Sequence, residues 1–260
     1  NEIKNNGGKI AILSSTIISP STTKLITDFS AAYGNVVHVQ MDAISYSGML
    51  DANEVSFGVR ALPTYNFDKA DVIVSFGADF LGNWLNVDYA TQYAAARNPK
   101  NGKMTKHYQV ESTLTLTGSN ADDRVQIKPS EQAGLLSNLY SALNGGQADS
   151  RIAKIANDLA NNTGKSIVVC NSNDAEVQTL INAINNKLGN YENTMSLSNP
   201  SHLKQGNDVG IATLIEEMNS GKIDALITYN VNPSYTLQNA EAYNSGLAKV
   251  GLTIATSLYN

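Results

Sequence analysis

The stretch Ala70–Trp84 constrains the fold more than any other part of the chain, because it joins a short apolar strand to a glycine turn. Residues 71–76 are Asp-Val-Ile-Val-Ser-Phe, and Gly77 follows them directly. A run of apolar and β-branched residues predicts a strand buried on both faces, as in a parallel sheet covered by helices. We expect a helix-like run to begin about four residues after the glycine. Ligands of such sheets bind beyond the carboxyl ends of the strands, so this turn is the first candidate site.

The rest of the chain alternates between strand-like and helix-like segments. Strands are predicted at residues 9–14, 36–41, 71–76, 107–111, 125–127, 166–170, 225–230 and 252–255. Helices are predicted at residues 20–33, 52–62, 88–97, 130–143, 151–161, 174–188, 208–219 and 238–249. The polar, glycine-containing residues 144–147 are a candidate joint between two halves of the chain. This alternation predicts an α/β fold with right-handed crossovers and a mainly parallel sheet.

Composition excludes several classes of protein. The chain has 260 residues, of which 42% are hydrophobic and 16% charged, as in a globular protein. A net charge of −5 argues against nucleic-acid binding, and the absence of an apolar run of about 18 residues argues against direct membrane insertion. The single Cys170 excludes a disulfide framework, a four-thiolate zinc site and an iron–sulfur cluster held by this chain alone. Because the chain begins at a linker-like stretch without Met, we expect a segment of a longer protein.

Four stretches of the chain carry, in order, a pattern of strands and turns found in one enzyme family. They are Phe67–Asp79, Glu111–Asp122, Val125–Ala133 and Ser220–Pro233. The pattern resembles the molybdopterin oxidoreductase family, with its strand and Gly-x-Asn turn, its Asp-Pro-Arg-x-Thr-x-Thr-Ala-x-x-Ala-Asp and Ile-Arg-Pro-Gly-Thr-Asp-x-Ala motifs, and its late strand followed by Asn-Pro. Each motif alone is a weak signal. Their order makes the resemblance specific, and it extends from Gly8 onward.

Within this family, Asp79–Trp84 and Thr117–Arg124 are most similar to the iron–sulfur B subunit of bacterial alternative complex III, a quinol-oxidising membrane assembly. The resemblance implies two Rossmann-like lobes with mainly parallel sheets. The first lobe would be discontinuous, residues 1–62 plus 201–260, and the second, residues 63–200, would be inserted into it. In active members a pterin-dinucleotide cofactor lies between the lobes, its metal has a further protein ligand, and an iron–sulfur module precedes both lobes.

The resemblance also implies which residues occupy the cofactor cleft. They are Gly77, Asp79, Thr115, Thr117, Asp122 and Asn232. Asp79 places a negative charge where active members place backbone amides, and often an Asn, near the phosphates. Two like charges about 4 Å apart repel by roughly 4 kcal/mol at an effective dielectric constant of 20, which is about three decades of affinity. Two roles remain open for Asp79: a residue that repels the phosphate, or a cap for the helix that follows it.

Three other positions depart from the family in residues that contact the ligand. Thr113 stands where the family has an Arg that suits phosphate. Gln132 stands where the family has an Asp that accepts hydrogen bonds from guanine, and Ser130 replaces a Gly where backbone approaches the ligand. Thr115, Thr117 and Asp122 are retained, and each is also an ordinary turn residue. We therefore expect a vestigial cleft in a retained fold.

The family's metal ligand corresponds loosely to the loop Asp42–Gly48, where Ser45 or Ser47 could formally serve. A serine in a glycine-containing turn is more often a turn residue, so we predict no metal site. Cys170 ends an apolar strand and is expected to be a buried small hydrophobe. The three histidines lack a partner at ligand spacing, and we expect structural roles for them: His38, His107 and His202.

These observations predict a scaffold and interaction domain without its own catalytic site, cofactor or metal. Its partners would be the iron–sulfur half of the same parent subunit and other subunits of a respiratory complex on the periplasmic side of the bacterial inner membrane. The first alternative is a segment that still binds molybdopterin guanine dinucleotide as part of a redox enzyme, and the second is a stand-alone nucleotide-binding domain. Candidate interface residues are Trp84, Tyr229, Tyr235 and Tyr243. Two alternatives stay open: the three tyrosines could line a cleft, and core packing is equally ordinary for Trp84.

Overall fold

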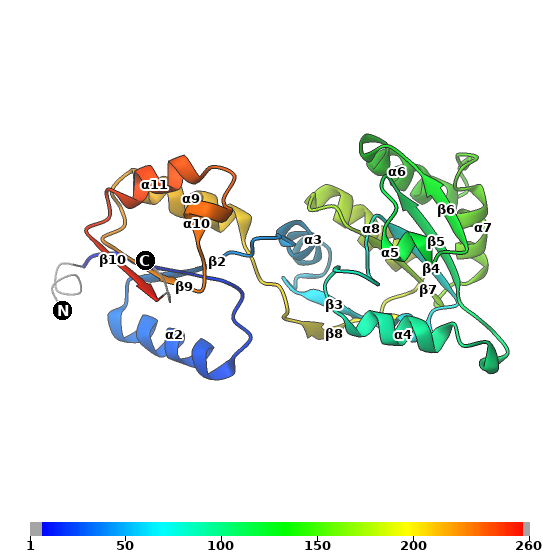
Figure 1. The fold of residues 1–260 in the computed structure, drawn as a ribbon, viewed down its shortest axis with the longest axis horizontal. Helices are drawn as coiled ribbons and strands as arrows, with labels where there is room; N and C mark the ends of the chain where they lie inside the picture. The colour runs from blue at the N-terminus through cyan, green and yellow to red at the C-terminus, as the bar shows by residue number, and fades with distance from the viewer. Residues whose placement is uncertain (1–6, 257–260) are drawn as a thin grey trace. The chain divides into compact units, whose positions relative to one another are not determined.

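The computed structural model describes residues 7–256, which form two α/β units (Figure 1). Unit 1 contains the described residues up to Ser47 and from Lys204 onward, and unit 2 is Gly48–Leu203. Unit 2 is therefore longer at both ends than the expected inserted lobe, residues 63–200. Within residues 7–256, no helix has the length and apolar character needed to cross a membrane.

Unit 1 is built on a parallel sheet with the strand order β10-β9-β1-β2. Its strands are β1 (Ile10–Ser14), β2 (Val36–Gln40), β9 (Ala225–Tyr229) and β10 (Leu252–Thr256). Its helices are α2 (Pro20–Tyr33), α9 (Asp208–Asn219), α10 (Pro233–Thr236) and α11 (Ala240–Leu247). Helix α2 covers one face of the sheet, and α9 to α11 cover the other (Figure 1). On that second face Leu13, Leu214 and Tyr243 belong to one buried cluster.

Unit 2 is built on a second parallel sheet, with the order β6-β5-β4-β7. Its strands are β4 (Val72–Phe76), β5 (Lys106–Glu111), β6 (Asp123–Gln126) and β7 (Ser166–Cys170). Its helices and short 3₁₀ turns are η1 (Phe67–Lys69), α4 (Asp88–Ala96), η2 (Pro99–Asn101), α5 (Leu116–Ser119), η3 (Pro129–Glu131), α6 (Gln132–Leu143), α7 (Ala153–Asn161) and α8 (Ala175–Lys187). Every residue of β4 and β7 is buried. The predicted α/β fold with mainly parallel sheets is confirmed.

The prediction of a helix over residues 52–62 was wrong at both ends. Helix α3 is Ser47–Phe57, and Gly58, with φ +72°, follows it in the left-handed conformation that commonly ends helices. Residues Leu62–Tyr65 instead form β3, which pairs antiparallel with β8 (Met195–Ser201). Strand β8 was not predicted, because its sequence Met-Ser-Leu-Ser-Asn-Pro-Ser has the composition of a loop.

Buried amide side chains attach α3 to unit 2. Asn182 of α8 donates to Oδ1 of Asn53 at 2.9 Å and to Oγ of Ser56 at 3.1 Å, both on α3. Asn53 in turn donates to the carbonyl oxygen of Ala61 at 2.7 Å. Buried amides require such partners, so these bonds explain why the unit boundary lies at the start of α3 rather than at its end.

The candidate joint at residues 144–147 is a turn inside unit 2, not a boundary. The amide of Gly145 donates to the carbonyl of Ala142 at 3.0 Å, and that of Gly146 donates to the carbonyl of Ser141 at 2.9 Å. Asn138 of α6 donates to the carbonyl of Gln147 at 3.2 Å. These residues therefore provide hydrogen-bond donors for carbonyl groups in the last turn of α6, and the chain then continues to α7.

Asn185 forms hydrogen bonds with the backbone at the outer edge of strand β7. The other edge of β7 pairs with β4. Its Nδ2 donates to the carbonyl of Val168 at 2.8 Å, and its Oδ1 accepts from the Val168 amide at 3.1 Å. The side chain thus replaces a neighbouring strand at one residue of this edge. Its neighbour Asn186 on the same helix is exposed.

We expect Asn185→Ala to lower the free energy of unfolding of unit 2 by about 3 kcal/mol, because both buried polar groups of Val168 lose their partner. Urea unfolding followed by tryptophan fluorescence measures this directly, since Trp84 is the sole tryptophan and lies in unit 2. Asn186→Ala is the matched control, with an expected change within about 0.5 kcal/mol. Equal effects of the two substitutions would contradict the assigned role of Asn185.

Candidate functional site

The carboxyl edge of the unit 2 sheet is the place where its topology would allow a ligand. From the central strand β4 the chain proceeds to β5 and β6 on one side, and then returns to β7 on the other. The direction of the strand order therefore reverses between β4 and β7. In open α/β sheets this reversal leaves a crevice at the carboxyl ends of the two strands, which is the usual ligand site.

Gln132, at the start of α6, covers this position. Its Nε2 lies 2.8 Å from the carbonyl oxygen of Phe76, the last residue of β4. The same nitrogen lies 3.2 Å from Sγ of Cys170, the last residue of β7, and 3.1 Å from Oδ1 of Asn171. One amide group thus bridges the ends of both strands at the point of reversal.

Gly77 lies beneath the Asn171 side chain. The glycine has φ +72°, a conformation that L side chains rarely adopt. A Cβ atom built on it would lie only 2.8 Å from Oδ1 of Asn171. The turn after β4 therefore approaches the turn after β7 closely, and side chains of this chain occupy the space between them.

Asp79 binds the neighbouring loop. Its Oδ1 accepts hydrogen bonds from the amide of Thr117 at 2.9 Å and from Oγ1 of Thr117 at 2.7 Å. Oγ1 of Thr117 accepts in return from the amide of Leu81 at 2.9 Å. A Cβ atom on Gly82 would lie 2.1 Å from Oδ2 of Asp79, so the carboxylate rests against bare backbone.

Asp79 is therefore a cap, although not of the helix that follows it in the chain. The residues after Asp79 form turns in which the amides of Gly82, Asn83 and Trp84 all donate to its carbonyl oxygen. The next helix, α4, begins only at Asp88. The carboxylate of Asp79 is instead bonded at the start of α5. The helix-like run expected about four residues after Gly77 is a series of turns in this loop.

Glu111 is a second carboxylate at this edge, and it is almost fully buried. Its Oε1 accepts from Nε of Arg124 at 2.6 Å, and its Oε2 accepts from Oγ1 of Thr115 at 2.7 Å and from Nε2 of Gln109 at 3.0 Å. A Cβ atom on Gly118 would lie 1.9 Å from Oε1 of Glu111. Burial acts to raise the pKa of Glu111, but the bonds from Arg124 and Thr115 outweigh it and hold the pKa below its ordinary value.

The structure brings together four of the six predicted cleft residues, which are Gly77, Asp79, Thr115 and Thr117. Asp122 precedes β6, at the opposite, amino edge of the sheet, where it accepts from Nη1 and Nη2 of Arg97 at 2.6 and 2.9 Å. This ion pair lowers the pKa of Asp122. Asn232 lies in unit 1, where its carbonyl accepts from the amides of Tyr235 and Thr236 at the start of α10.

The remaining candidates are bonded within the fold. Ser45 donates to Oδ2 of Asp208 at 2.7 Å, and Ser47 Oγ accepts from the amide of Asp208 at 3.2 Å, so both serve the start of α9. His38 lies 2.8 Å from Oγ of Ser14, which is fully buried and out of reach of a substrate. Among the described residues, no group of three or more His, Cys, Asp or Glu side chains could hold a metal ion.

Trp84 packs in the core of unit 2 and is not a surface contact residue. It belongs to an aromatic cluster of buried rings whose centroids lie 4.5–6.1 Å apart: Tyr65, Phe67, Phe80, Trp84, Tyr89 and Tyr93. Tyr243 is also buried. Of the four candidate interface residues only Tyr229 and Tyr235 are exposed, at 43% and 85%.

A polar row along β5 was not predicted. His107, Gln109 and Glu111 alternate along this strand and therefore share one face of the sheet. All three are buried. Alternating polar residues in a short strand usually indicate an exposed face, and the sequence contained no signal that helix α4 and the loops at either edge would cover this one.

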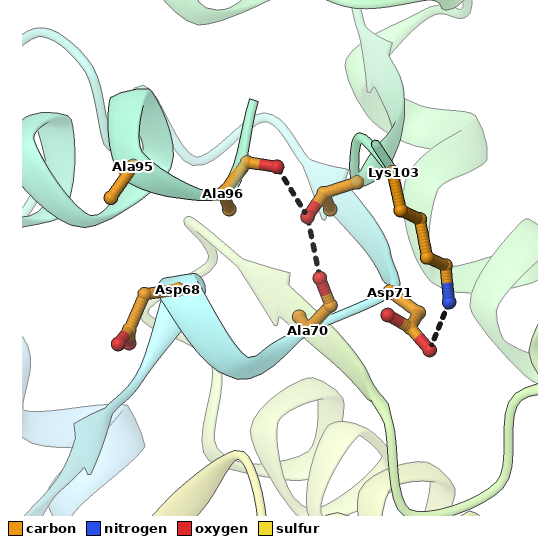
Figure 2. Close-up of a pocket in the computed structure, with 7 residues that line it drawn as sticks. Asp68, Ala70, Asp71, Ala95, Ala96 and Lys103 are labelled. Carbon is orange, nitrogen blue, oxygen red and sulfur yellow. Dashed lines mark hydrogen bonds and ion pairs between the residues drawn. The ribbon is translucent and has the colours of Figure 1, made fainter. Parts of the chain in front are cut away.

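A shallow hollow of about 360 Å³ lies at the amino edge of the same sheet (Figure 2). Lys103 and Asp71 form an ion pair of 2.7 Å at its rim. Thr105 donates to the carbonyl of Ala70 at 2.6 Å across its floor. These two pairs of polar groups are thus mutually bonded, and the hollow lies opposite the edge where the predicted cleft residues gather.

The comparisons with known proteins return structures only. No family model and no curated protein matches the sequence. Acetylene hydratase from Pelobacter acetylenicus superposes with a TM-score of 0.70 at 12% identity, over 95% of this chain and 46% of that one. The formyltransferase/hydrolase complex FhcABCD from Methylorubrum extorquens, solved with methylofuran, gives a TM-score of 0.63 at 14% identity, over 98% of this chain and 76% of that one.

The chain spans about half the length of the acetylene hydratase chain. At these identities the comparison establishes the fold alone. That fold is an α/β architecture with two parallel four-stranded sheets, resembling the domains of molybdopterin enzymes.

We expect Asp79→Ala to destabilise unit 2 by about 1–2 kcal/mol, because the amide and hydroxyl of Thr117 both lose their acceptor. The exposed Asp68, which lies on the nearby turn η1, is the matched control as Asp68→Ala. Urea unfolding monitored through Trp84 distinguishes the two. If Asp79→Ala is as stable as the control, the carboxylate does not hold the two loops together.

We also expect the free energy of unfolding of unit 2 to decrease as the pH is lowered below 7, before the carboxylates of unit 2 become protonated. Burial lowers the pKa of His107 to about 4, against a smaller opposing effect of Gln109. Between about pH 6.5 and pH 4 the unfolded chain therefore binds a proton that the folded chain does not, and the free energy of unfolding decreases as the pH falls. Between pH 7 and pH 5 the expected loss is about 2 kcal/mol. In His107→Gln the pH dependence over this interval should largely disappear, and an unchanged slope would exclude His107 as its source.

Proposed function

We propose that this chain is a cofactor-free, molybdopterin-oxidoreductase-like scaffold and interaction domain of a respiratory, quinol-oxidising electron-transfer complex. The branch that its motifs most resemble is the iron–sulfur B subunit of bacterial alternative complex III. In that role the chain would have no catalytic site of its own, and its location would be the periplasmic side of the inner membrane. Its partners would be the iron–sulfur half of the same parent subunit, which would hold the clusters, and the other subunits of the complex.

The observation that carries this proposal is the bridge formed by Gln132. A ligand at the reversal point between β4 and β7 would need the strand ends and the turn amides as partners. Gln132 is bonded there to Phe76, Cys170 and Asn171. A dinucleotide would have to displace this side chain and leave those groups to find new partners, which opposes binding.

The charge at this edge supports the same conclusion. The carboxylates of Asp79 and Glu111 both lie among the loops that follow β4 and β5. Arg124 is already paired with Glu111 at 2.6 Å. A diphosphate would therefore meet one uncompensated carboxylate and a guanidinium whose charge is neutralised, an arrangement that opposes anion binding.

Exposed apolar side chains on unit 1 support a role in interaction. Ile12, Ile227 and Ile254 are paired across β1, β9 and β10, so they lie on one face of the sheet. Tyr229, Leu252 and Ile254 on this same face are 43%, 46% and 45% exposed. Helix α2 covers this face of the sheet at Ile12, which is buried, but the edge strand β10 is exposed along its whole length (Figure 1). Exposed apolar patches commonly mark contacts with other proteins.

The alternative is a segment that holds molybdopterin guanine dinucleotide within a redox enzyme. Its support is the retention of Thr115 and Thr117 beside Gly77, in a fold of the same class. Both threonines are bonded to carboxylates, Thr115 to Glu111 and Thr117 to Asp79. They therefore have structural roles that do not require a cofactor.

Two measurements separate the two functions. In isothermal titration with GDP, which represents the guanine and diphosphate of the cofactor, we expect no binding in the micromolar range. The matched variant Gln132→Gly, with the bridge removed, reports whether that side chain limits access. Elemental analysis of the full-length parent, purified from cells that make the cofactor, should give iron without molybdenum or tungsten. One molybdenum or tungsten per chain would establish the enzymatic alternative and overturn the scaffold proposal.

A further inference from the structure

The strongest unassigned feature of the molecule is a buried phenol bonded to a buried imidazole. The hydroxyl of Tyr93, on α4, lies 3.0 Å from Nδ1 of His107 on β5 and 2.9 Å from the carbonyl oxygen of Asn120. Tyr93 is 7% exposed and His107 is fully buried. The proposed scaffold role requires neither side chain.

The row of polar side chains on β5 determines which nitrogen of His107 carries the proton. Ionised Glu111 can only accept, so the amide nitrogen of Gln109 must face it, as the 3.0 Å bond requires. Oε1 of Gln109 then faces the other way along the strand, toward His107. Neither Oε1 of Gln109 nor Nε2 of His107 has a hydrogen-bond partner among the described residues, and the Gln109 side chain raises the His107 pKa, as an acceptor near the ring would.

This orientation assigns the proton of the neutral ring to Nε2. Because a neutral imidazole carries one proton, Nδ1 is left as a lone-pair acceptor. The single hydrogen of the Tyr93 hydroxyl has two acceptors within reach, the carbonyl oxygen of Asn120 at 2.9 Å and Nδ1 of His107 at 3.0 Å. The phenol oxygen thus lies at a distance from a nitrogen base that suits direct proton transfer.

The pair lies at the end of the aromatic cluster defined above. Phe80 is 5.6 Å from the Tyr93 ring and 5.3 Å from the His107 ring, centroid to centroid. Phe80 stacks on Phe67 at 4.5 Å, and Phe67 lies 5.0 Å from Tyr89. Trp84, the other readily oxidised ring, is 5.9 Å from Tyr89, and its Nε1 has no partner among the described residues.

We propose that Tyr93 and His107 form a proton-coupled redox pair. A one-electron oxidation of the unit 2 aromatic cluster then ends as a radical on Tyr93. The reactant is an outer-sphere one-electron oxidant of high potential, which takes one electron from the Tyr93 phenol. The O–H bond breaks, the proton moves to Nδ1 of His107, and the products are a neutral tyrosyl radical, an imidazolium and the reduced oxidant. Trp84 lacks a base for its N–H, so a hole formed there would be less stabilised than one at Tyr93.

Burial favours this chemistry in two ways. It lowers the pKa of His107 to about 4, so the ring is unprotonated at neutral pH and free to accept, while an oxidised phenol is a far stronger acid than imidazolium. It also keeps the radical away from soluble reductants. Asp122 and Glu111 are negative groups near the imidazolium, and Arg97 is a positive one that Asp122 neutralises at 2.6 Å.

The test is photo-oxidation of the intact protein with ruthenium(II) tris(bipyridine) and persulfate, followed by ascorbate to remove radicals at exposed tyrosines. Electron paramagnetic resonance should then show a tyrosyl radical that persists in wild type and is lost in Tyr93→Phe. Tyr243→Phe is the matched control, since Tyr243 is also buried but belongs to unit 1, and it should retain the signal. Circular dichroism of each variant verifies folding.

Further measurements distinguish the pair from a merely buried tyrosine. Formation of the radical in wild type should slow in D₂O, because the O–H bond breaks in the same step, and this readout requires no substitution. His107→Gln should remove both the persistence and the isotope effect. Tyr108 donates to Asp158 and is the competing buried phenol. A persistent radical that survives Tyr93→Phe, that is lost in Tyr108→Phe, or that is absent from wild type overturns the proposal.

Discussion

The need of buried polar groups for a hydrogen-bond partner is the constraint on which the carboxyl edge of unit 2 depends. Parallel strands end there with free carbonyls, and loops begin there with free amides, so this edge must bind either a ligand or the protein itself. In this chain Gln132 binds the ends of β4 and β7, and Asp79 binds the amide and hydroxyl of Thr117. Each bond stabilises the fold and also removes a partner that a ligand would have used.

The same constraint explains the polar row on β5. A buried carboxylate is tolerated when several donors surround it, and Glu111 has Arg124, Thr115 and Gln109. Because Glu111 accepts only, it orients Gln109, and Gln109 in turn orients His107. A negative group at one edge of the sheet therefore sets the proton position near the other edge, next to Arg97 and Asp122. The row connects two regions that appear unrelated in the sequence.

The order and type of most elements could be predicted from the sequence, because apolar strands such as 72–76 and 166–170 are buried on both faces and carry a strong local signal. Strands β3 and β8 could not, because their pairing depends on residues more than a hundred positions apart, such as Leu62 and Ser201. For the candidate site, only the position of residues that directly follow a strand could be predicted. Gly77 and Asp79 follow a strong strand, whereas the partner of Asp79 lies on another loop and is set by tertiary structure.

The position of Asp122 shows why motif and geometry must be separated. It stands in the same motif as Thr115 and Thr117, yet those two residues cap and form the short helix α5, and the chain returns across the sheet after α5 before β6 begins. Asp122 therefore pairs with Arg97 at the amino edge, while the threonines remain at the carboxyl edge. A residue kept at this position stabilises the sheet whether or not a cofactor is bound. The presence of these motif residues is thus evidence for the fold. Only the residues at the crevice itself, such as Gln132, are evidence for or against ligand binding.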